Sequence, residues 1–407
     1  MTGNRLGRPV KVMVVLGTRP EVIKLAPVIM ELRRHENRIQ TLVCATGQHR
    51  EMLQQMLNTF NLRPDFNLDV MKTNQSLADV TGAVLTGMDS VLRKEKPDLM
   101  LVQGDTTTTM AASLAAFYRQ VPVGHVEAGL RTGDRQNPFP EEINRRLTTH
   151  IADYHFAPTE LSRQNLLREG VSDEHILITG NTVVDALFYI VANLHALAPR
   201  VIPDVPNGKR LILVTAHRRE SFGAGIRQIC EALRRLSLSR SDILIVYPVH
   251  LNPNVQDPVR TILEGTPNVL LLEPLDYVSF IALMRRAHIL LTDSGGMQEE
   301  GPSLRKPVLV MRSVSERPEA VFAGAASLVG TDPERIVASV NRLLDDAELY
   351  RDMTSRKNPF GDGAAARRIV QFLGQKLGID MPDAHATPLP PMSDQRPATE
   401  EQVSRFS

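Results

Sequence analysis

Short apolar runs alternate with longer amphipathic segments along most of this chain. Each run is rich in Val, Ile and Leu with little polar alternation, which is typical of strands buried on both faces of a parallel sheet. The runs lie at residues 10–16, 39–45, 98–103, 121–126, 153–157, 175–180, 210–215, 242–247, 268–273, 288–292 and 307–311. Helical patterns such as EVIKLAPVIMELRR separate them. This alternation predicts an α/β protein with doubly wound parallel sheets.

The runs form two sets of similar size. Between the sets lies the segment 196–209, which holds three prolines and one glycine. We therefore expect an N-terminal domain over residues 1–177 and a C-terminal domain over residues 178–361. Residues 381–407 contain five prolines and few large apolar side chains, so we expect a disordered tail there.

Composition narrows the classes of function. The 407 residues carry a formal net charge of +1, which argues against a nucleic-acid surface or a polybasic membrane patch. The two cysteines, Cys44 and Cys230, are too few for a disulfide framework and indicate a reducing compartment. No apolar run approaches the roughly 18 residues of a membrane span, and the first run is too short for a signal peptide. We expect a cytoplasmic protein.

Three carboxylates lie where elements of the first half begin or end. Asp105 follows the run 98–103, Glu127 follows the run 121–126, and Glu141 opens the helix predicted from PFPEEINRR. Taken singly, each has an ordinary role as a helix cap or as a complement to the helix dipole. Because neighbouring parallel strands end at one edge of a sheet, the three could together form an acid/base cluster with mutually shifted pKa values.

Cationic side chains follow other strands. The segment GTRPEVIK places Arg19 and Lys24 beside a predicted helix N-terminus, which is a natural anion site. His217 follows the run 210–215 together with Arg218 and Arg219. A solvated cationic loop would explain this group, but the histidine is also a phosphate-binding or acid/base candidate.

The segment LLTDSGGMQEE is the strongest single signal in the second half. At Ser294, Gly295 and Gly296, backbone N–H groups can meet a diphosphate without interference from a Cβ atom. Glu300 lies about one turn further on, where it could accept hydrogen bonds from a ribose diol. Arg317, downstream, could neutralise phosphate.

Signatures of other nucleotide and metal chemistry are missing from the sequence. There is no Walker lysine loop, and no G-x-G-x-x-G fingerprint follows the first strand. His125-x-Glu127 resembles half of a zinc-deaminase signature but lacks its downstream Cys-x-x-Cys. We therefore expect no ATP hydrolysis, no NAD and no catalytic zinc.

These segments together resemble the non-hydrolysing UDP-N-acetylglucosamine 2-epimerases over roughly residues 10–375. The matching blocks are GTRPEVIKLAPV, TGQHREML, GDTTTTMAASLAAFY, GHVEAGLRTGD, PFPEEINRRLT, ITGNTVVDAL, AHRRESFG, YPVHLNPNV, LTDSGGMQEE and ERPEAV. The resemblance implies the GT-B fold, in which two Rossmann-like domains face a central cleft. It also implies that a C-terminal helix within residues 362–380 returns to the first domain.

The resemblance implies interconversion of UDP-N-acetylglucosamine and UDP-N-acetylmannosamine for bacterial surface polysaccharide. UDP would leave and return with inversion at C-2, without a cofactor or a catalytic metal. Family members are typically homodimers, and the apolar helix TTMAASLAAFYRQ offers either a dimer surface or a buried crossover helix.

The resemblance also assigns roles to residues. Asp105, Glu127 and Glu141 would carry the acid/base work, and His217 would assist at the diphosphate. Leu275, through its backbone, and Phe280, by packing, would receive uracil. The remaining substrate-binding positions are Arg19, Lys24, Ser294, Gly295, Gly296, Glu300 and Arg317.

Some positions depart from the family pattern. Ser313, Val314 and Ser315 stand where an acid and hydroxyl residues are common, and Arg305 stands where glycine is common. Some members bind a second substrate molecule as an activator. The candidate effector residues here are Gln48, His49 and Arg218, next to Arg50, but Asn74 replaces the arginine that would complete the site.

Three other functions fit parts of the pattern. A GT-B glycosyltransferase would share the nucleotide site but would need an acceptor and not three acids. A hydrolysing 2-epimerase would release N-acetylmannosamine, and a nucleotide-sugar sensor would not turn over.

Overall fold

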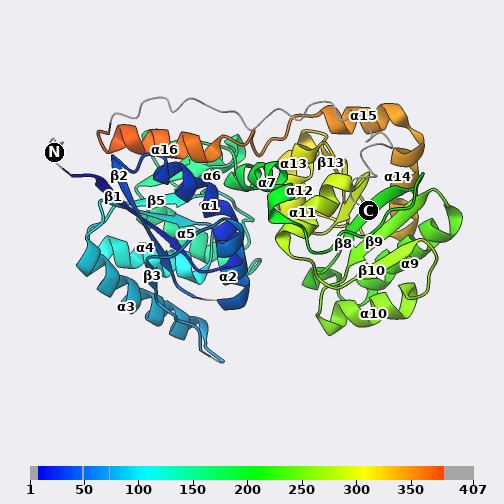
Figure 1. The fold of residues 1–407 in the computed structure, drawn as a ribbon, viewed down its shortest axis with the longest axis horizontal. Helices are drawn as coiled ribbons and strands as arrows, with labels where there is room; N and C mark the ends of the chain where they lie inside the picture. Colours follow the sequence, from blue (N-terminus) through cyan, green and yellow to red (C-terminus); the bar gives the residue numbers. More distant parts are fainter. Residues whose placement is uncertain (1–7, 48–49, 73, 380–407) are drawn as a thin grey trace.

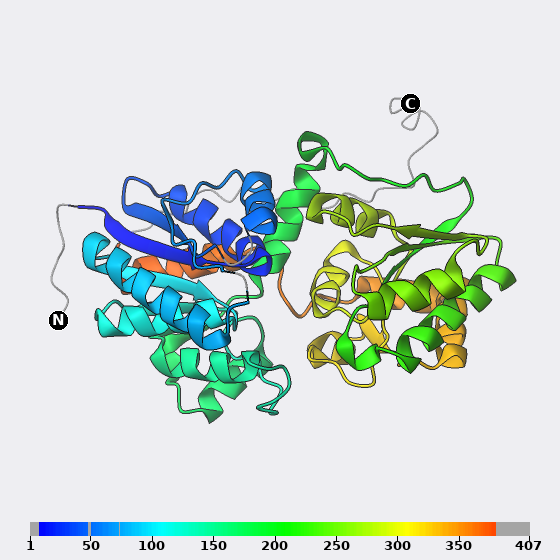
Figure 2. The same ribbon diagram turned by 90° about the horizontal axis from the view of Figure 1, so that it is seen from below.

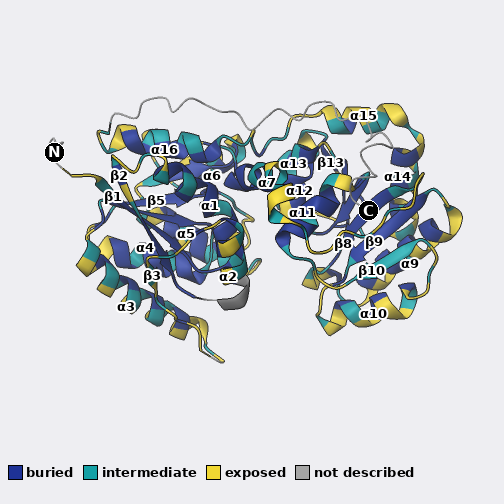
Figure 3. Ribbon diagram, in the orientation of Figure 1, coloured by how far each residue is buried: buried dark blue, intermediate teal, exposed yellow. Residues whose placement is uncertain are grey.

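The computed structural model describes residues 8–47, 50–72 and 74–379. Two parallel β-sheets lie side by side, each flanked by helices (Figure 1). Their strands are largely buried, whereas the outer helices expose one face (Figure 3). The prediction of an α/β protein with doubly wound sheets is confirmed.

The first sheet has seven strands in the order β3-β2-β1-β4-β5-β6-β7, all parallel. Its strands are β1 (Val10–Leu16), β2 (Ile39–Ala45), β3 (Phe66–Asn67), β4 (Leu99–Gln103), β5 (Val123–Val126), β6 (Tyr154–Ala157) and β7 (Ile176–Ile178). Its helices are α1 (Arg19–Arg33), α2 (Arg50–Thr59), α3 (Leu77–Glu95), α4 (Thr107–Tyr118), α5 (Glu141–Ile151) and α6 (Glu160–Arg168). Along β1, Val12 and Val14 face one apolar cluster while Met13 and Val15 face another, so both faces of the sheet are covered.

The second sheet has six parallel strands in the order β10-β9-β8-β11-β12-β13. They are β8 (Arg210–Thr215), β9 (Ile243–Pro248), β10 (Val269–Leu272), β11 (Ile289–Thr292), β12 (Val308–Val310) and β13 (Ala326–Leu328). The helices are α9 (Ala224–Ser239), α10 (Pro253–Leu263), α11 (Tyr277–Arg286), α12 (Gly295–Glu300), α13 (Pro318–Phe322), α14 (Pro333–Asp345) and α15 (Ala347–Ser355).

All eleven predicted strands are present, with each end within two residues of its predicted place. The prediction missed β3 and β13, which have two and three residues. Both are edge strands. Strands β7 and β12 are as short as β13 but lie within continuous apolar runs, whereas β3 and β13 lie in the segments DFNLDV and GAASLVG, which are interrupted by polar or small residues.

Each sheet reverses its strand order once, between β1 and β4 and between β8 and β11. Open α/β sheets bind ligands in the crevice at the carboxyl ends of the strands where this reversal occurs. The segments that follow these four strands begin at Gly17, Gly104, Ala216 and Asp293. Ligand-binding residues are therefore expected in these four segments.

Helix α7 (Thr182–Ala192) joins the two halves, followed by α8 (Leu194–Leu197). It packs against α1 on one side and against α11 and α12 on the other, and Figure 2 shows the two halves from below. The C-terminal helix α16 (Ala365–Lys376) packs against α1 and α7. Asp185 of α7 accepts hydrogen bonds from the first N–H groups of α16, at 3.3 and 2.9 Å. The domain bounds 1–177 and 178–361 stay predictions, and the tail 381–407 lies outside the described residues.

Helix α4 corresponds to the segment TTMAASLAAFYRQ. It packs between α3 and α5, and its alanines at 111, 112, 115 and 116 are all buried. Only Phe117 and Tyr118 at its end are largely exposed among its large apolar residues. This is the packing of a buried crossover helix. Within the described ranges, no helix is both long and apolar enough to cross a bilayer.

Candidate active site

Glu127 directly follows β5 and is buried. Its φ of 64° lies in the left-handed region, which costs a non-glycine residue about 1–3 kcal/mol. The carboxylate points toward the end of β4, since Oε2 would lie 3.9 Å from a Cβ atom placed on Gly104. Strained backbone of this kind is concentrated at functional sites.

Three side chains donate to the Glu127 carboxylate. Lys24 of α1 places its Nζ 2.6 Å from both carboxylate oxygens. Gln103, the last residue of β4, donates through Nε2, and Asn181 donates its Nδ2 to Oε1 at 3.1 Å. Burial by itself lowers the pKa of Lys24, but the charges of Glu127 and Glu299 outweigh burial and raise that pKa above its ordinary value. Lys24 is therefore a charged partner of Glu127, a contact that the sequence did not indicate.

Arg317 adds a charge from the second domain. Its Nε donates to Glu299, and its Nη2 lies 3.8 Å from Oε1 of Glu127. The Asn181 Nδ2 also donates to Glu299, at 2.9 Å, so one amide joins both carboxylates. Burial alone would raise the pKa of Glu127, but the charges of Lys24 and Arg317 hold it below its ordinary value. Glu127 is therefore ionised at neutral pH.

Asp105 lies at the neighbouring strand end, two residues beyond β4. Arg145 of α5 donates its Nη2 to the Asp105 carboxylate. The N-cap of α4 is Thr106, whose side chain accepts the N–H of Thr109 at 3.1 Å. The capping role that would have explained Asp105 therefore belongs to its neighbour.

Glu141 is the first residue of α5, and its carboxylate has no hydrogen bond or ion pair with any residue that the structure describes. Arg145 lies four residues after Glu141, so the two residues share one face of α5. Arg145 donates to Asp105, so this face of the helix is directed toward Asp105. The adjacent Glu142 differs, because it is fully buried and accepts N–H groups of the 132–133 turn at 3.1 and 3.3 Å. Glu142 stabilises the loop, and Glu141 remains available for chemistry.

His217 lies beyond the end of β8, where Asp293 supports it. One Asp293 oxygen accepts the N–H groups of His217 and Arg218, each at 2.7 Å, and the other lies 3.5 Å from His217 Nδ1. The His250 ring stacks on the His217 ring at a centroid separation of 5.6 Å. Burial lowers the pKa of His217, and its Asp293 neighbour opposes this only in part. The imidazole is therefore mainly neutral at neutral pH.

Ser294 is the N-cap residue of α12, and Gly295 and Gly296 are its first two residues. A Cβ atom on Gly296 would lie no closer than 3.7 Å to a neighbour. On Gly295 it would lie 3.7 Å from Nη2 of Arg218 and 4.0 Å from Cζ of Arg317. Two guanidinium groups therefore lie beside the glycine pair predicted to meet a diphosphate.

Glu300 accepts a hydrogen bond from the hydroxyl of Tyr277 at 2.7 Å. Burial raises its pKa to about 7. The charge of Arg19 partly opposes the effect of burial on the pKa values of Tyr277 and Glu300. Arg19 therefore lies near both side chains, and the segment after β1 reaches the second domain. Leu275 and Phe280 are partly buried and pack against the apolar core.

The departures from the family pattern have structural consequences. Arg305 has a φ of 54°, a left-handed conformation that explains why glycine is common at this position. Ser315 donates to Gln298 at 2.5 Å and accepts the N–H of Arg317 at 2.9 Å, so this substitution still supports the arginine. Of the effector candidates, Gln48 and His49 lie outside the described residues, and Arg218 donates to Glu316 at 3.3 Å.

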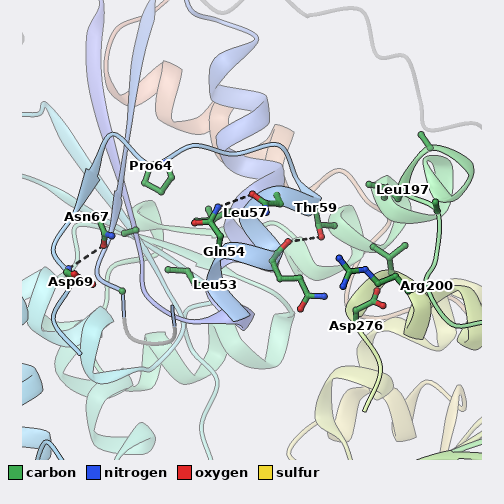
Figure 4. Close-up of a pocket in the computed structure, with 17 residues that line it drawn as sticks. Leu53, Gln54, Leu57, Thr59, Pro64, Asn67, Asp69, Leu197, Arg200 and Asp276 are labelled. Carbon is green, nitrogen blue, oxygen red and sulfur yellow. Dashed lines mark hydrogen bonds between the residues drawn. The ribbon is translucent and has the colours of Figure 1, made fainter. Parts of the chain in front are cut away.

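A cavity of about 1110 Å³ lies between the two domains, lined by α2, the segment 64–69, the segment 196–200 and the start of α11 (Figure 4). Asp276 and Val278 line it on either side of Tyr277. The loop predicted to receive uracil therefore borders this cavity. None of the predicted site residues that the structure describes, including Leu275 and Phe280, lines the cavity itself.

The sequence prediction missed several side chains that support the site. Gln103, Asn181 and Glu299 contact Glu127 or its partners, and Asp293 supports His217. Gln103 and Asn181 each lie at or just after a strand end, which is the signal that could have revealed them. Glu299 precedes the predicted Glu300, and only three-dimensional contacts distinguish the two.

Comparisons with known proteins give one consistent result. A family model described as UDP-N-acetylglucosamine 2-epimerase matches residues 30–374. The chain is 54% identical over 373 residues to the UDP-N-acetylglucosamine 2-epimerase of Escherichia coli (strain K12), covering 89% of this chain and 98% of that protein. The structure is similar to that of the UDP-GlcNAc 2-epimerase from Neisseria meningitidis bound to UDP-GlcNAc, with 48% identity, a TM-score of 0.84 and coverage of 90% of this chain and 100% of that one. It is also similar to the Methanocaldococcus jannaschii enzyme in complex with UDP-GlcNAc and UDP, with 36% identity, a TM-score of 0.73 and the same coverage.

Proposed function

Because this chain belongs to the UDP-N-acetylglucosamine 2-epimerase family, we propose that it interconverts UDP-N-acetylglucosamine and UDP-N-acetylmannosamine without net hydrolysis. It is an isomerase, and its two Rossmann-like domains form the GT-B fold predicted from the sequence. The observation that carries the proposal is the Glu127 carboxylate, kept ionised between Lys24 and Arg317 where the two domains meet.

The proposed reaction begins with elimination. The C-2 proton of the sugar is not acidic, so cleavage of the C-1–oxygen bond to UDP must precede or accompany its removal. The C-2 proton passes to a carboxylate, a C-1–C-2 double bond forms and UDP leaves. In the return step a proton is delivered to the opposite face of C-2, and a UDP oxygen reforms the bond to C-1.

The charges around the site suit both steps. Leaving UDP gains negative charge, which Arg19, His217, Arg317 and the backbone N–H groups of Gly295 and Gly296 can stabilise. The backbone N–H of Ser294 instead donates to Oγ1 of Thr292 at 2.9 Å. We assign Glu300 to the ribose and the segment with Leu275 and Phe280 to uracil. Asp105, Glu127 and Glu141 supply carboxylates for proton transfer and for a sugar that becomes cationic as its C-1 bond breaks. No step needs an oxidant or a reductant, because the loss of UDP together with the C-2 proton and their readdition are each redox-neutral.

One experiment separates this reaction from the alternatives. Purified protein would be incubated with UDP-N-acetylglucosamine alone in deuterated water with a chelator and followed by proton NMR. We expect UDP-N-acetylmannosamine to appear, with deuterium at C-2 of both sugars. Accumulation of free N-acetylmannosamine and UDP would indicate a hydrolysing enzyme. Transfer only after an acceptor is added would indicate a glycosyltransferase, and binding without turnover would indicate a sensor.

Gly296→Val tests the diphosphate site. The branched side chain would occupy the space in front of the first N–H groups of α12, so we expect UDP to bind about 10- to 100-fold more weakly, as for loss of one or two charged hydrogen bonds. Calorimetry with UDP measures this. Gly82→Val is the matched control, because Gly82 is an exposed helical glycine of α3 with nothing within 4 Å of its added Cβ atom. Equal UDP affinity in both variants would remove residues 294–296 from the site.

Three further features belong to the proposal. We place the protein in the cytoplasm as a homodimer that supplies bacterial surface polysaccharide synthesis. A monomer mass by light scattering at micromolar concentration would contradict the dimer. Its interface lies elsewhere than on the buried alanine face of α4.

A further inference from the structure

Asn181 has a second role beyond its place at the start of a helix. It is the N-cap residue of α7, and its Oδ1 accepts the N–H of Val183 at 3.2 Å. Its own N–H donates to the carbonyl of Phe360 at 2.6 Å, and the side chain is buried. The cap alone is an ordinary structural feature that Ser, Thr or Asp would serve as well.

The cap determines which way the amide faces. Because Oδ1 is directed at the helix N-terminus, Nδ2 must be directed away from it. On that side Nδ2 lies 3.1 Å from Oε1 of Glu127 and 2.9 Å from Oε2 of Glu299. Among the preferred N-cap side chains, only asparagine combines the capping acceptor with two N–H donors on one rigid planar group.

The position of α7 places the Asn181 side chain where the two domains meet. The helix packs against α1, which carries Lys24, and against α12, which carries Glu299. Lys24 and Glu299 are the principal charged partners of Glu127 and Arg317, respectively. The Asn181 amide therefore lies at the start of a helix that packs against both domains. It lies between the carboxylate of Glu127 from the first domain and that of Glu299 from the second.

We propose that Asn181 is a positioning residue that holds the carboxylates of Glu127 and Glu299 apart and in fixed orientation, one for proton transfer and the other for Arg317. The inference rests on the proposed function through the role of Glu127. Asn181 touches neither substrate nor reacting atoms in this assignment and acts through the two acids.

The charges that face Glu127 give the inference a pH signature. Lys24 faces it from α1, Arg317 from the segment before α13, Glu299 lies across the shared amide, and His125 lies on its own strand. Asn181→Asp would retain the cap but place a third carboxylate within hydrogen-bonding distance of the other two. The three carboxylates would outnumber the two cations, Lys24 and Arg317, and the added one would raise the pKa values of its neighbours, so protons would be retained to higher pH.

The test compares wild type, Asn181→Ser and Asn181→Asp. Both changes keep an N-cap acceptor. For Asn181→Ser we expect kcat to fall about 10²-fold, the scale of a misplacement of about 1 Å, while UDP affinity stays within about twofold. For Asn181→Asp we expect the acid limb of the kcat/KM profile to move up by about one pH unit or more. Asp332→Asn and Asp332→Ser are matched controls, because Asp332 caps the remote helix α14 through the N–H of Arg335.

A second measurement needs no turnover. Carboxyl carbon-13 NMR of Glu127 in wild type and Asn181→Asp should show its titration at higher pH in the variant. If wild type converts no sugar, the proposed function fails, and this titration still decides whether Asn181 sets the state of Glu127. If Asn181→Asp does not fold, the kcat of Asn181→Ser decides. Wild-type kcat and an unmoved pH profile in folded variants would return Asn181 to a capping role alone and overturn the inference.

Discussion

Glu127→Gln is expected to lower kcat for epimerisation by about 10²–10⁴-fold, the usual contribution of one acid/base group. The amide has the shape of the carboxylate, and its one oxygen can accept hydrogen bonds from Lys24 and Gln103, but its NH2 group then faces the Asn181 donor. The amide cannot take a proton from carbon. UDP binding should change little, because the nucleotide is assigned to the second domain. The measurement is a set of paired turnover rates, UDP affinities and thermal midpoints.

Asp105→Asn and Glu141→Gln extend the same test to the other two acids. If all three acids surround C-2, each amide should slow turnover by orders of magnitude. Asp105→Asn and Glu141→Gln should change folding little, whereas Glu127→Gln also removes the counter-charge of the largely buried Lys24 and should lower the free energy of unfolding. Glu334→Gln is the control for Glu141, because Glu334 is an exposed acid in the first turn of the remote helix α14. Replacing a first-turn acid that only complements the helix dipole costs about 1 kcal/mol or less. Near-normal turnover in all three variants would remove the proton carriers from the proposed mechanism.

Arg317→Met is expected to affect stability and binding together. It leaves Glu299, whose side chain is only 1% exposed, without its cationic partner. Breaking a buried ion pair from one side typically costs about 3–5 kcal/mol in the free energy of unfolding. The same change removes a guanidinium group from beside Gly295, so UDP should bind more weakly as well.

The stability loss should depend on pH in a defined direction. In Arg317→Met, Glu127 loses one of the two charges that hold its pKa below the ordinary value, so its pKa in the folded variant should be higher than in the folded wild type. The folded variant then binds more protons than the folded wild type over that range, so the stability deficit of the variant shrinks as pH falls through it. Urea unfolding at pH 5 and pH 8 should show the larger deficit relative to wild type at pH 8.

A double variant separates the two effects of Arg317. Arg317→Met with Glu299→Gln removes the unpaired charge, so much of the stability should return while UDP binding stays weak. Recovery of UDP affinity together with stability would show that Arg317 acts only through folding. An equal deficit at both pH values would show that Arg317 does not help to hold the pKa of Glu127 below its ordinary value.

Local sequence pattern determined most of the architecture. A strand buried on both faces of a parallel sheet has a continuous run of apolar residues. Such a run can be recognised from local sequence alone, so all eleven predicted strands are present in the structure. The positions of Asp105, Glu127 and His217 at strand ends followed from the same runs. Strands β3 and β13 were missed because polar or small residues interrupt the apolar residues around them.

Tertiary structure alone decided which groups meet at those strand ends. Lys24 and Glu127 are 103 residues apart, and Asn181 and Glu299 are 118 residues apart. The sequence pattern therefore predicted Lys24 as part of an anion-binding site, whereas in the structure Lys24 is paired with Glu127. Thr106 rather than Asp105 caps α4, and Glu142 rather than Glu141 is committed to its loop. Neighbouring polar residues at a helix start cannot be told apart from the local sequence. Only the packing of α1, α5, α7 and α12 around the strand ends determines which of them stabilises its own helix or loop and which remains available for chemistry.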